Sequence, residues 1–366
     1  MSHALGVYVH VPFCRTRCRY CDFYRVGEHR GRMDRFVAAL GCEIDGSPEL
    51  DGARVETVFF GGGTPSLLAP AEIGAILARL ARRCRLAADA EVTAEANPSD
   101  LDLATLRALR AAGVNRLSVG VQSFADRELA LIGRRHDAER AARVVAEARA
   151  AGFDNLSLDL MVGIPAQTAG SFTRSLERAI ALAPDHLSLY LLEVHAGSEL
   201  DFLRRERPAL FAGDEAQRRR YLRLRERLVA AGYRHYEISN FARPGHECRH
   251  NLRYWRCEEW LGLGPAAHSH VGGRRFRHRP DLDAWSADPL AFEELPIEPA
   301  AERVFLGLRL AEGIEEAWLA AAGIDTAEAG RRLARLAPFV ERDAGRVRLN
   351  ADGYLVSNAV LAELLR

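Results

Sequence analysis

Short apolar runs alternate with longer stretches of helical spacing along the first two thirds of the chain. The apolar runs predict six strands, at Gly6–Val11, Val55–Phe60, Glu91–Glu95, Arg116–Gln122, Asn155–Val162 and His186–Leu192. Apolar positions three and four residues apart predict helices at Ala71–Cys84, Leu103–Ala112, Ala138–Ala151, Phe172–Leu182 and Asp214–Ala231. Alternating strands and helices imply parallel strands joined by right-handed crossovers. Six such units predict an α/β fold built as an open or partial (β/α)6 barrel.

Glycines mark the ends of three of these predicted helices. Gly113, Gly152 and Gly232 each follow a helical run, where a residue with positive φ commonly ends a helix. They support the helix boundaries that the apolar spacing predicts.

The pattern changes after about residue 240. Residues 241–298 are rich in Arg, His, Trp and Gly, and we expect them to form loops over the barrel mouth. Residues 299–366 predict a small C-terminal α+β domain that is mostly helical. Its expected elements are helices at Ala300–Leu310, Ala327–Leu336 and Ser357–Leu365, and a hairpin from Arg346–Leu349 and Gly353–Tyr354. The barrel itself is expected to occupy residues 1–240.

Composition narrows the function classes. The 366 residues carry 50 basic and 50 acidic side chains, so no overall field attracts nucleic acid. The chain has no lysine, which excludes a lysine-dependent phosphate loop and a lysine Schiff base. No run reaches the roughly 18 apolar residues that a membrane span needs. The N-terminus lacks a signal-peptide pattern, so we expect a cytoplasmic protein without a transmembrane segment.

Three of the seven cysteines crowd together just after the first predicted strand. Cys14, Cys18 and Cys21 have the spacing C-x3-C-x2-C, which in a reducing compartment favours a metal site over disulfides. Three thiolates on a short loop can bind three irons of a [4Fe–4S] cluster and leave the fourth iron open. The alternative is a zinc site, for which His10 or His29 would supply the missing ligand.

A glycine-rich turn follows the second predicted strand. Gly61-Gly-Gly-Thr-Pro65 lets a ligand approach the backbone closely and leaves amide N–H groups pointing outward. Taken alone it could simply be a turn that ends a strand. Beside the cysteine triplet it is a candidate seat for the amino-acid end of a bound cofactor.

The segment Tyr8-Val-His-Val-Pro-Phe-Cys-Arg-Thr-Arg-Cys-Arg-Tyr-Cys-Asp-Phe23, followed by Gly-Gly-Gly-Thr-Pro, resembles the radical SAM superfamily. In particular it looks like the oxygen-independent coproporphyrinogen III oxidase-like family. The resemblance implies that Cys14, Cys18 and Cys21 hold a [4Fe–4S] cluster and that S-adenosylmethionine (SAM) chelates the fourth iron. An electron donor would reduce the cluster, which then cleaves SAM to a 5′-deoxyadenosyl radical.

The same resemblance implies a set of SAM contacts, several of which end predicted strands, where (β/α) barrels build their sites. The set comprises Tyr8, Tyr20, Gly62, Gly63, Thr64, Glu95, Gln122, Arg134 and Asp159. Asp159 interrupts an apolar strand, so it must be paired or face a polar cavity. Singly, each polar residue could instead cap a helix or pair with an arginine, and both tyrosines could be core residues.

His250-Asn251-Leu-Arg-Tyr254-Trp255 is similar to an element of the haem-chaperone branch of this family. That similarity implies haem as cargo, with His250 on the haem iron and the other three residues around the macrocycle. From the residues alone, a structural histidine with core aromatics is the competing interpretation. The following run Leu261-Gly-Leu-Gly-Pro-Ala-Ala-His268-Ser269 also resembles this branch, and we expect it to line the SAM side of the mouth. For Cys248 and Cys257 we expect a packing role.

Two departures from the oxidase pattern favour the chaperone branch. Phe23 stands where the oxidase has a fourth cysteine, and the first strand begins at about residue 6, without a long N-terminal arm. We therefore expect a radical-SAM-type haem chaperone that delivers haem to haem-requiring proteins, such as respiratory membrane enzymes. Coproporphyrinogen III oxidase activity, or radical transfer to another substrate, is the alternative. The sequence does not decide whether the protein is a monomer or a homodimer.

Overall fold

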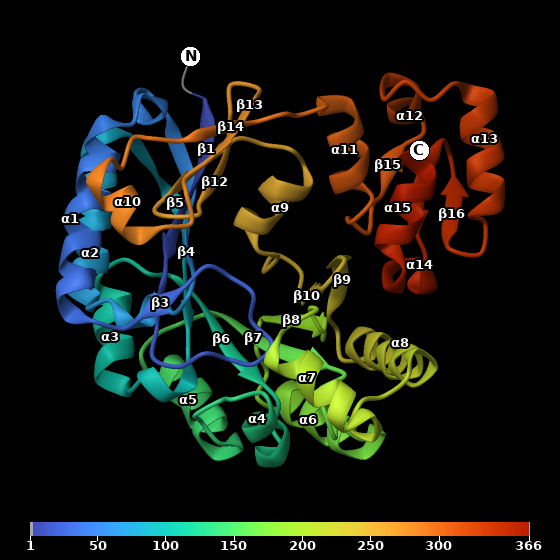
Figure 1. The fold of residues 1–366 in the computed structure, drawn as a ribbon, viewed down its shortest axis with the longest axis horizontal. Coiled ribbons are helices and arrows are strands. Elements are labelled where there is room, and N and C mark those ends of the chain that lie inside the picture. Colours follow the sequence, from blue (N-terminus) through green and yellow to red (C-terminus); the bar gives the residue numbers. More distant parts are fainter. Residues whose placement is uncertain (1–2, 366) are drawn as a thin grey trace.

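The computed structural model describes residues 3–365 and is built around one curved sheet of twelve strands (Figure 1). All six strands expected in the first two thirds form, and they pair in parallel in chain order. They are β1 (Ala4–Val11), β4 (Arg54–Gly62), β5 (Arg85–Ala96), β6 (Arg116–Gln122), β7 (Asn155–Val162) and β8 (His186–Leu191). The two end strands of the sheet do not pair with each other, so the barrel is open, as the sequence predicts.

Helices cover the outer face of the sheet (Figure 1). The five expected helices form as α2 (Pro70–Arg83), α3 (Leu103–Ala111), α5 (Ala138–Ala150), α6 (Ala169–Ala181) and α8 (Asp214–Ala230). Gly113, Gly152 and Gly232 follow three of them with φ of 107°, 88° and 88°, which confirms their role at the helix ends. Shorter helices are α4 (Asp126–Leu131) and α7 (Glu199–Glu206).

The long helix α1 (Arg30–Gly46) was not expected from the sequence. Its buried residues include Met33, Phe36, Leu40 and Ile44, which recur at helical spacing and pack into the main core. That spacing was the signal that could have identified it. Four short 3-10 turns, each beginning at a proline, complete the connections: Pro48–Leu50, Pro65–Leu67, Pro98–Asp100 and Pro208–Leu210.

The expectation that residues 241–298 form loops over the barrel mouth is wrong. This segment adds strands to both ends of the sheet and contributes two helices. The elements in and beside it are β9 (Arg234–Glu237), β10 (Asn240–Ala242), α9 (Arg249–Trp255), β11 (Trp260–Leu263), β12 (His268–Val271), β13 (Arg274–Arg277), α10 (Leu282–Ala287) and β14 (Glu293–Leu295). The edge strands are short and have charged outer faces, so their alternation of polar and apolar residues is weak.

β11 has the most consequential position of these strands, because it pairs in parallel with β1. Tyr8 of β1 is therefore in register with Gly262 on one side and with Phe59 of β4 on the other. The first strand of the chain consequently lies inside the sheet.

The C-terminal residues build a second hydrophobic core (Figure 1). Its elements are α11 (Pro299–Gly307), β15 (Ile314–Glu315), α12 (Ala317–Ala321), α13 (Thr326–Arg335), β16 (Val340–Asp343), β17 (Arg346–Leu349), α14 (Ala351–Leu355) and α15 (Ser357–Leu365). The expected hairpin is only half right, because β17 pairs with the preceding β16. Gly353 and Tyr354 are helical, since the Asn350 side chain accepts a hydrogen bond from Gly353 N–H and starts α14.

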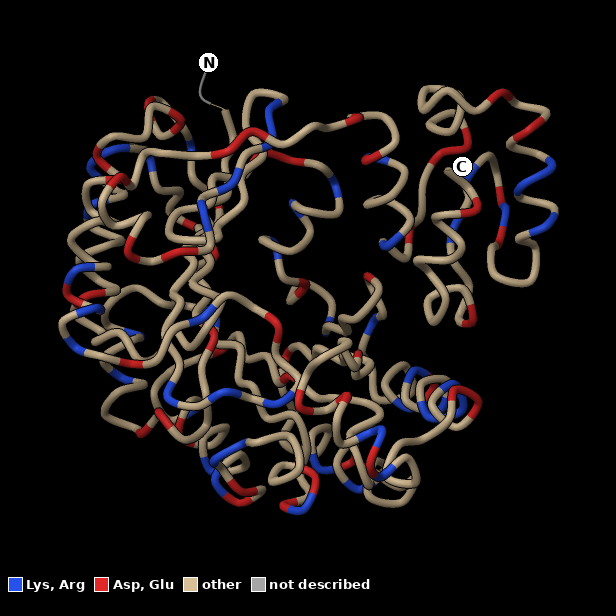
Figure 2. Tube along the Cα trace, in the orientation of Figure 1, with Lys and Arg blue, Asp and Glu red and all other residues tan. Residues whose placement is uncertain are grey.

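Charges of both signs interleave over the whole chain, as the net charge of zero suggests (Figure 2). Arg218 on α8 forms two hydrogen bonds of 2.7 and 2.9 Å to Asp352 on α14, which joins the barrel to the C-terminal elements. Within residues 3–365, no helix has both the length and the apolar character needed to cross a membrane.

Candidate cofactor cavity

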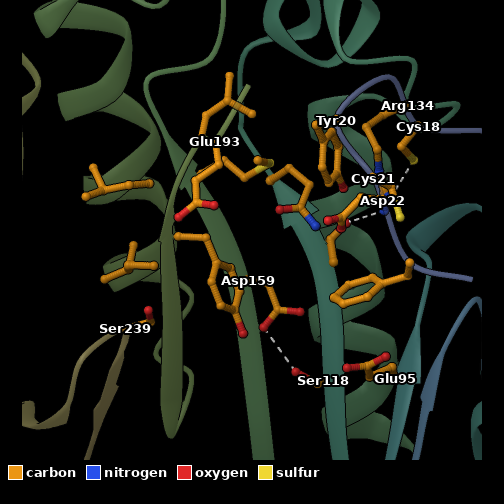
Figure 3. Close-up of a pocket in the computed structure, with 18 of the residues that line it drawn as sticks. Cys18, Tyr20, Cys21, Asp22, Glu95, Ser118, Arg134, Asp159, Glu193 and Ser239 are labelled. Carbon is orange, nitrogen blue, oxygen red and sulfur yellow. Dashed lines mark hydrogen bonds between the residues drawn. The ribbon is translucent and has the colours of Figure 1, made fainter. Parts of the chain in front are cut away.

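A cavity of about 840 Å³ opens at the carboxyl ends of the parallel strands, between the barrel and the C-terminal elements. Its wall includes the cysteine loop on one side and β8 with the chain that follows it on the other (Figure 3). The N-terminal end of α15 also contributes, through Ser357 and the two residues after it. Parallel α/β sheets build their ligand sites at this end of the strands.

The three clustered cysteines all line this cavity as free thiols. Cys14 lies in the two-residue strand β2 (Phe13–Cys14), which pairs with β3 (Val26–Gly27). The loop between these strands carries the other two thiols and is held to the barrel where Arg19 N–H donates to Ile132 O at 3.1 Å. Burial raises the pKa of Cys14 and Cys21, so a cation or metal is needed to hold them as thiolates.

The arrangement of the thiols fits a cluster better than a single zinc ion. Among residues 3–365, no three His, Cys, Asp or Glu side chains lie close enough together to hold one metal ion. An iron–sulfur cluster instead takes each thiolate on a different iron, which spaces the sulfurs apart. Two arginines supply positive charge beside the thiols. Arg134 Nη1 lies 3.5 Å from Cys18 Sγ, and the charge of Arg25 favours the thiolate forms of Cys14 and Cys21.

The glycine turn after β4 forms a tight cradle beside the cysteine loop. Gly62 has φ of 103°, a conformation that side chains rarely tolerate. A Cβ on Gly63 would lie 2.6 Å from Phe13 O, so this position has no room for a side chain. Thr64 Oγ1 lies 3.4 Å from Cys14 Sγ, which joins the turn to the first thiol.

Two carboxyl groups lie deeper in the cavity (Figure 3). Burial, reinforced by the nearby charge of Asp159, raises the pKa of Glu95 to about 7. Glu95 Oε2 accepts a hydrogen bond of 3.2 Å from Gly62 N–H. Burial also raises the pKa of Asp159, whose Oδ1 accepts a hydrogen bond of 3.0 Å from Ser118 Oγ. These acceptors suit the hydroxyl and amino groups of a polar cofactor.

Arg134 connects the cavity floor to the cysteine loop. Its Nη2 donates to Asn97 Oδ1 at 2.6 Å and to Gly120 O at 2.5 Å, while Nη1 faces Cys18. Gln122, at the end of β6, has φ of 65°, and this unusual conformation places it on the cavity wall.

Eight of the nine residues expected to contact SAM line the cavity together, and Tyr8 does not. The eight are Tyr20, Gly62, Gly63, Thr64, Glu95, Gln122, Arg134 and Asp159. Tyr8 instead packs against both Phe59 and His250, and its hydroxyl lies 3.2 Å from His10 Nδ1. The core-packing interpretation of Tyr8 therefore agrees with the structure.

His250 lies away from the cavity, and its expected place at the barrel mouth is wrong. The side chain is fully buried in α9 against the middle of β4. Its Nδ1 forms a 2.8 Å hydrogen bond with Thr57 Oγ1, and its Nε2 forms one of 2.8 Å with Tyr254 OH. Burial, followed by the charges of Arg253 and Arg116, lowers the pKa of His250 to about 3. Both ring nitrogens are therefore engaged, and this geometry gives no support to the expected role as haem-iron ligand.

The rest of the motif is also structural in this conformation. The Glu91 carboxylate on β5 accepts hydrogen bonds from the backbone N–H groups of Arg249 and His250, at 3.0 and 3.1 Å, which fixes the start of α9. The guanidinium group of Arg309 lies 5.8 Å from the centre of the Trp255 ring. No residue from 241 to 298 lines the cavity. Asn251, Cys248, Cys257 and the run that ends in His268 and Ser269 therefore all lie outside its wall.

Several lining residues were not anticipated. They include Asp22, Phe23, Asn97, Ser118, Tyr190, Glu193, His195 and Ser239. Ser118 and Tyr190 point to the same side of β6 and β8 as Asp159 of β7, which is the period-two signal that could have found them. Asp22 and His195 lie in irregular loops, where no such pattern exists.

The chain is similar to known proteins in sequence and in fold. A profile of the radical SAM superfamily matches residues 8–179. The "Heme chaperone HemW" of Mycobacterium tuberculosis is 39% identical, over 98% of this chain and 94% of its own length. That of Bacillus subtilis is 34% identical, over 98% of this chain and 99% of its own.

A solved structure agrees with these sequence matches. Coproporphyrinogen III oxidase (HemN) from Escherichia coli, described as a radical SAM enzyme, superposes with a TM-score of 0.84. The alignment covers 99% of this chain and 90% of that one, at 26% sequence identity. The thiol loop, the glycine cradle and the full-length similarity agree: the chain belongs to the HemW family of the radical SAM superfamily.

Proposed function

We propose that this protein is a haem chaperone that holds a [4Fe–4S] cluster and SAM and passes haem to haem-requiring proteins. The observation that carries the proposal is the near full-length similarity to two proteins named as haem chaperones. The cavity adds three free thiols and a cofactor-sized space to that similarity.

Within the cavity, Cys14, Cys18 and Cys21 would hold three irons of the cluster, and the glycine cradle would bind the amino-acid end of SAM. Such a cluster supplies single electrons to the sulfonium of SAM. The backbone of Gly62 and Gly63 leaves room for close approach, and Glu95 and Asp159 offer acceptors for hydroxyl and amino groups. Arg134 stabilises negative charge on Cys18 and orients the loop that carries it.

The partners in this proposal are haem as cargo, an electron donor for the cluster and one or more haem-requiring clients, such as respiratory membrane enzymes. The cytoplasm is the proposed compartment. We assign His250 and Tyr254 of α9 a structural part in this function, because the His250 ring bonds both Thr57 Oγ1 and Tyr254 OH. Asn251 and Trp255 lie outside the cavity wall as well.

The test is anaerobic reconstitution followed by haem loading and transfer. We expect about four irons and four sulfides per chain, haem binding with a defined Soret band, and transfer of that haem to apomyoglobin as a generic acceptor. Replacing Cys14, Cys18 or Cys21 by Ser should remove the cluster absorbance, whereas Cys42→Ser, at an exposed free thiol, should retain it. A protein that binds no haem in any of these states would contradict the proposal.

Oxygen-independent coproporphyrinogen III oxidase is the second candidate, because the HemN structure superposes over nearly the whole chain. Phe23, whose side chain is 64% exposed, occupies the position where the oxidase pattern has another cysteine. The reconstituted protein, incubated with coproporphyrinogen III, SAM and a reductant, should form no protoporphyrinogen IX. Formation of product over many turnovers would move the protein to the oxidase class.

A further inference from the structure

Part of the large cavity has no role in the assignments above. Beyond the cysteine loop and the glycine cradle, its wall includes Tyr190 of β8 and three residues of the chain that follows this strand, Leu192, Glu193 and His195. Glu193 is labelled in Figure 3. This wall touches the thiol-bearing loop at one point, where His195 Nε2 lies 3.4 Å from Asp22 Oδ2. The cavity volume of about 840 Å³ lies in the upper part of the roughly 300–1,000 Å³ that is typical of ligand sites.

His195 is the one histidine among residues 3–365 that lines the cavity. Its side chain is 43% exposed, and within residues 3–365 its one polar side-chain partner is Asp22. The contrast with His250 is large, because that imidazole is fully buried and makes two hydrogen bonds of 2.8 Å. An iron atom can reach His195 by replacing one long, solvent-exposed contact.

The residues around His195 can contact the macrocycle and the propionates of an iron porphyrin. Phe23 and Tyr190 are 64% and 43% exposed as whole residues and line the same cavity, so they offer aromatic surface to a flat apolar macrocycle. Arg25 and Arg135 also line it, and within residues 3–365 neither is paired with a carboxylate, although Arg25 Nη2 donates to Cys21 O at 3.4 Å. Guanidinium groups in this state can bind the two propionates of haem.

We infer that His195 is the protein ligand of the haem iron, with the macrocycle against Phe23 and Tyr190. The inference rests on the proposed function and assigns a residue to it. Asp22 competes with the iron for Nε2 of His195, which makes the bond easy to exchange. An exchangeable axial bond suits haem that is carried and then released.

The experiment compares two ligands that differ only in the metal. Iron(III) protoporphyrin IX is titrated into the reconstituted full chain and followed by the Soret band, and metal-free protoporphyrin IX is followed by fluorescence. In His195→Ala, haem should bind at least ten-fold more weakly and with a shifted Soret maximum, whereas metal-free porphyrin should bind as in the parent. His29→Ala, at an exposed histidine outside the cavity, is the matched control and should leave both affinities unchanged.

Other outcomes overturn one claim or the other. If the parent binds haem and His195→Ala binds it equally, with an unchanged spectrum, His195 is not the ligand while the chaperone proposal stands. If His195→Ala loses both porphyrins to the same degree, the residue shapes the cavity and does not bind iron, which also overturns the inference. If the parent binds neither porphyrin, the chaperone proposal itself fails.

Discussion

The imidazole Nδ1 of His250 lies 2.8 Å from Thr57 Oγ1, which fastens α9 to the middle of β4. Tyr254 closes the other side of the ring, so the motif histidine is a buried connector between a helix and the sheet. We expect His250→Ala to destabilise the protein by about 2–4 kcal/mol, because it leaves a cavity and unpaired hydroxyl groups. Urea unfolding of the cluster-free chain measures this change. A loss below 0.5 kcal/mol, as for an ordinary surface substitution, would contradict the connector role.

The charge of Arg134 should set the reduction potential of the cluster. Its guanidinium lies 3.5 Å from Cys18 Sγ and favours the more negative, reduced cluster. Arg134→Gln should therefore make the potential more negative, by on the order of tens of millivolts. A redox titration followed by electron paramagnetic resonance measures the shift. Arg174→Gln on the exposed face of α6 is the control, and an equal shift there would show that the proximity to Cys18 is irrelevant.

Glu237 should make stability depend on pH. The carboxyl is 1% exposed, and burial raises its pKa to about 7. Between the unfolded pKa, near 4.5, and about 7, the folded state holds a proton that the unfolded state has lost. The stability contribution of this group therefore falls as pH rises through that window, by up to about 3 kcal/mol.

Glu237→Gln keeps the shape and removes the titration. Its unfolding midpoint should exceed that of the parent more at pH 8 than at pH 5, and urea unfolding of the cluster-free chain at both values tests this. Glu226→Gln, in the exposed part of α8, is the control. Its unfolding midpoint should equal that of the parent at both pH values. A parent whose stability follows the same pH curve as Glu237→Gln would refute the assignment.

The tight cradle gives a fourth prediction. Because a Cβ on Gly63 would meet the backbone oxygen of Phe13 at 2.6 Å, Gly63→Ala must push the turn and the cysteine loop apart. Reconstituted Gly63→Ala should hold less iron and bind SAM at least ten-fold more weakly by equilibrium dialysis. Gly27→Ala has open space around the new methyl group and serves as the control. Normal iron content and SAM affinity in Gly63→Ala would show that the turn can accommodate a methyl group at this position.

The sequence predicts the strand–helix order from local rules, and it also predicts eleven of the residues that line the cavity, namely the three cysteines and eight of the expected SAM contacts. Parallel strands are buried on both faces, and Asp159 is conspicuous as the one ionisable side chain of β7. The spacing of Cys14, Cys18 and Cys21 is likewise local. The carboxyl ends of parallel strands then gather these residues at one edge without further information.

The motif around His250 could not be placed from the sequence, because its position depends on distant partners. Glu91, which holds the start of α9, is 159 residues away from His250 in the chain. His195 and Asp22 were missed for a related reason. They meet through the conformation of two loops, and a loop carries no periodic pattern from which a side-chain direction can be inferred.

The position of β1 between β4 and β11 has a consequence for how the chain folds. Tyr8 pairs on one side with Phe59 and on the other with Gly262, a residue more than two thirds of the way along the sequence. One edge of the strand that precedes the cysteine loop therefore stays open during synthesis until β11 leaves the ribosome. Such non-local pairing is slow, and an open strand edge is prone to aggregation. A fragment ending near residue 179 would keep every cysteine of the loop, but its first strand would lack the pairing with β11.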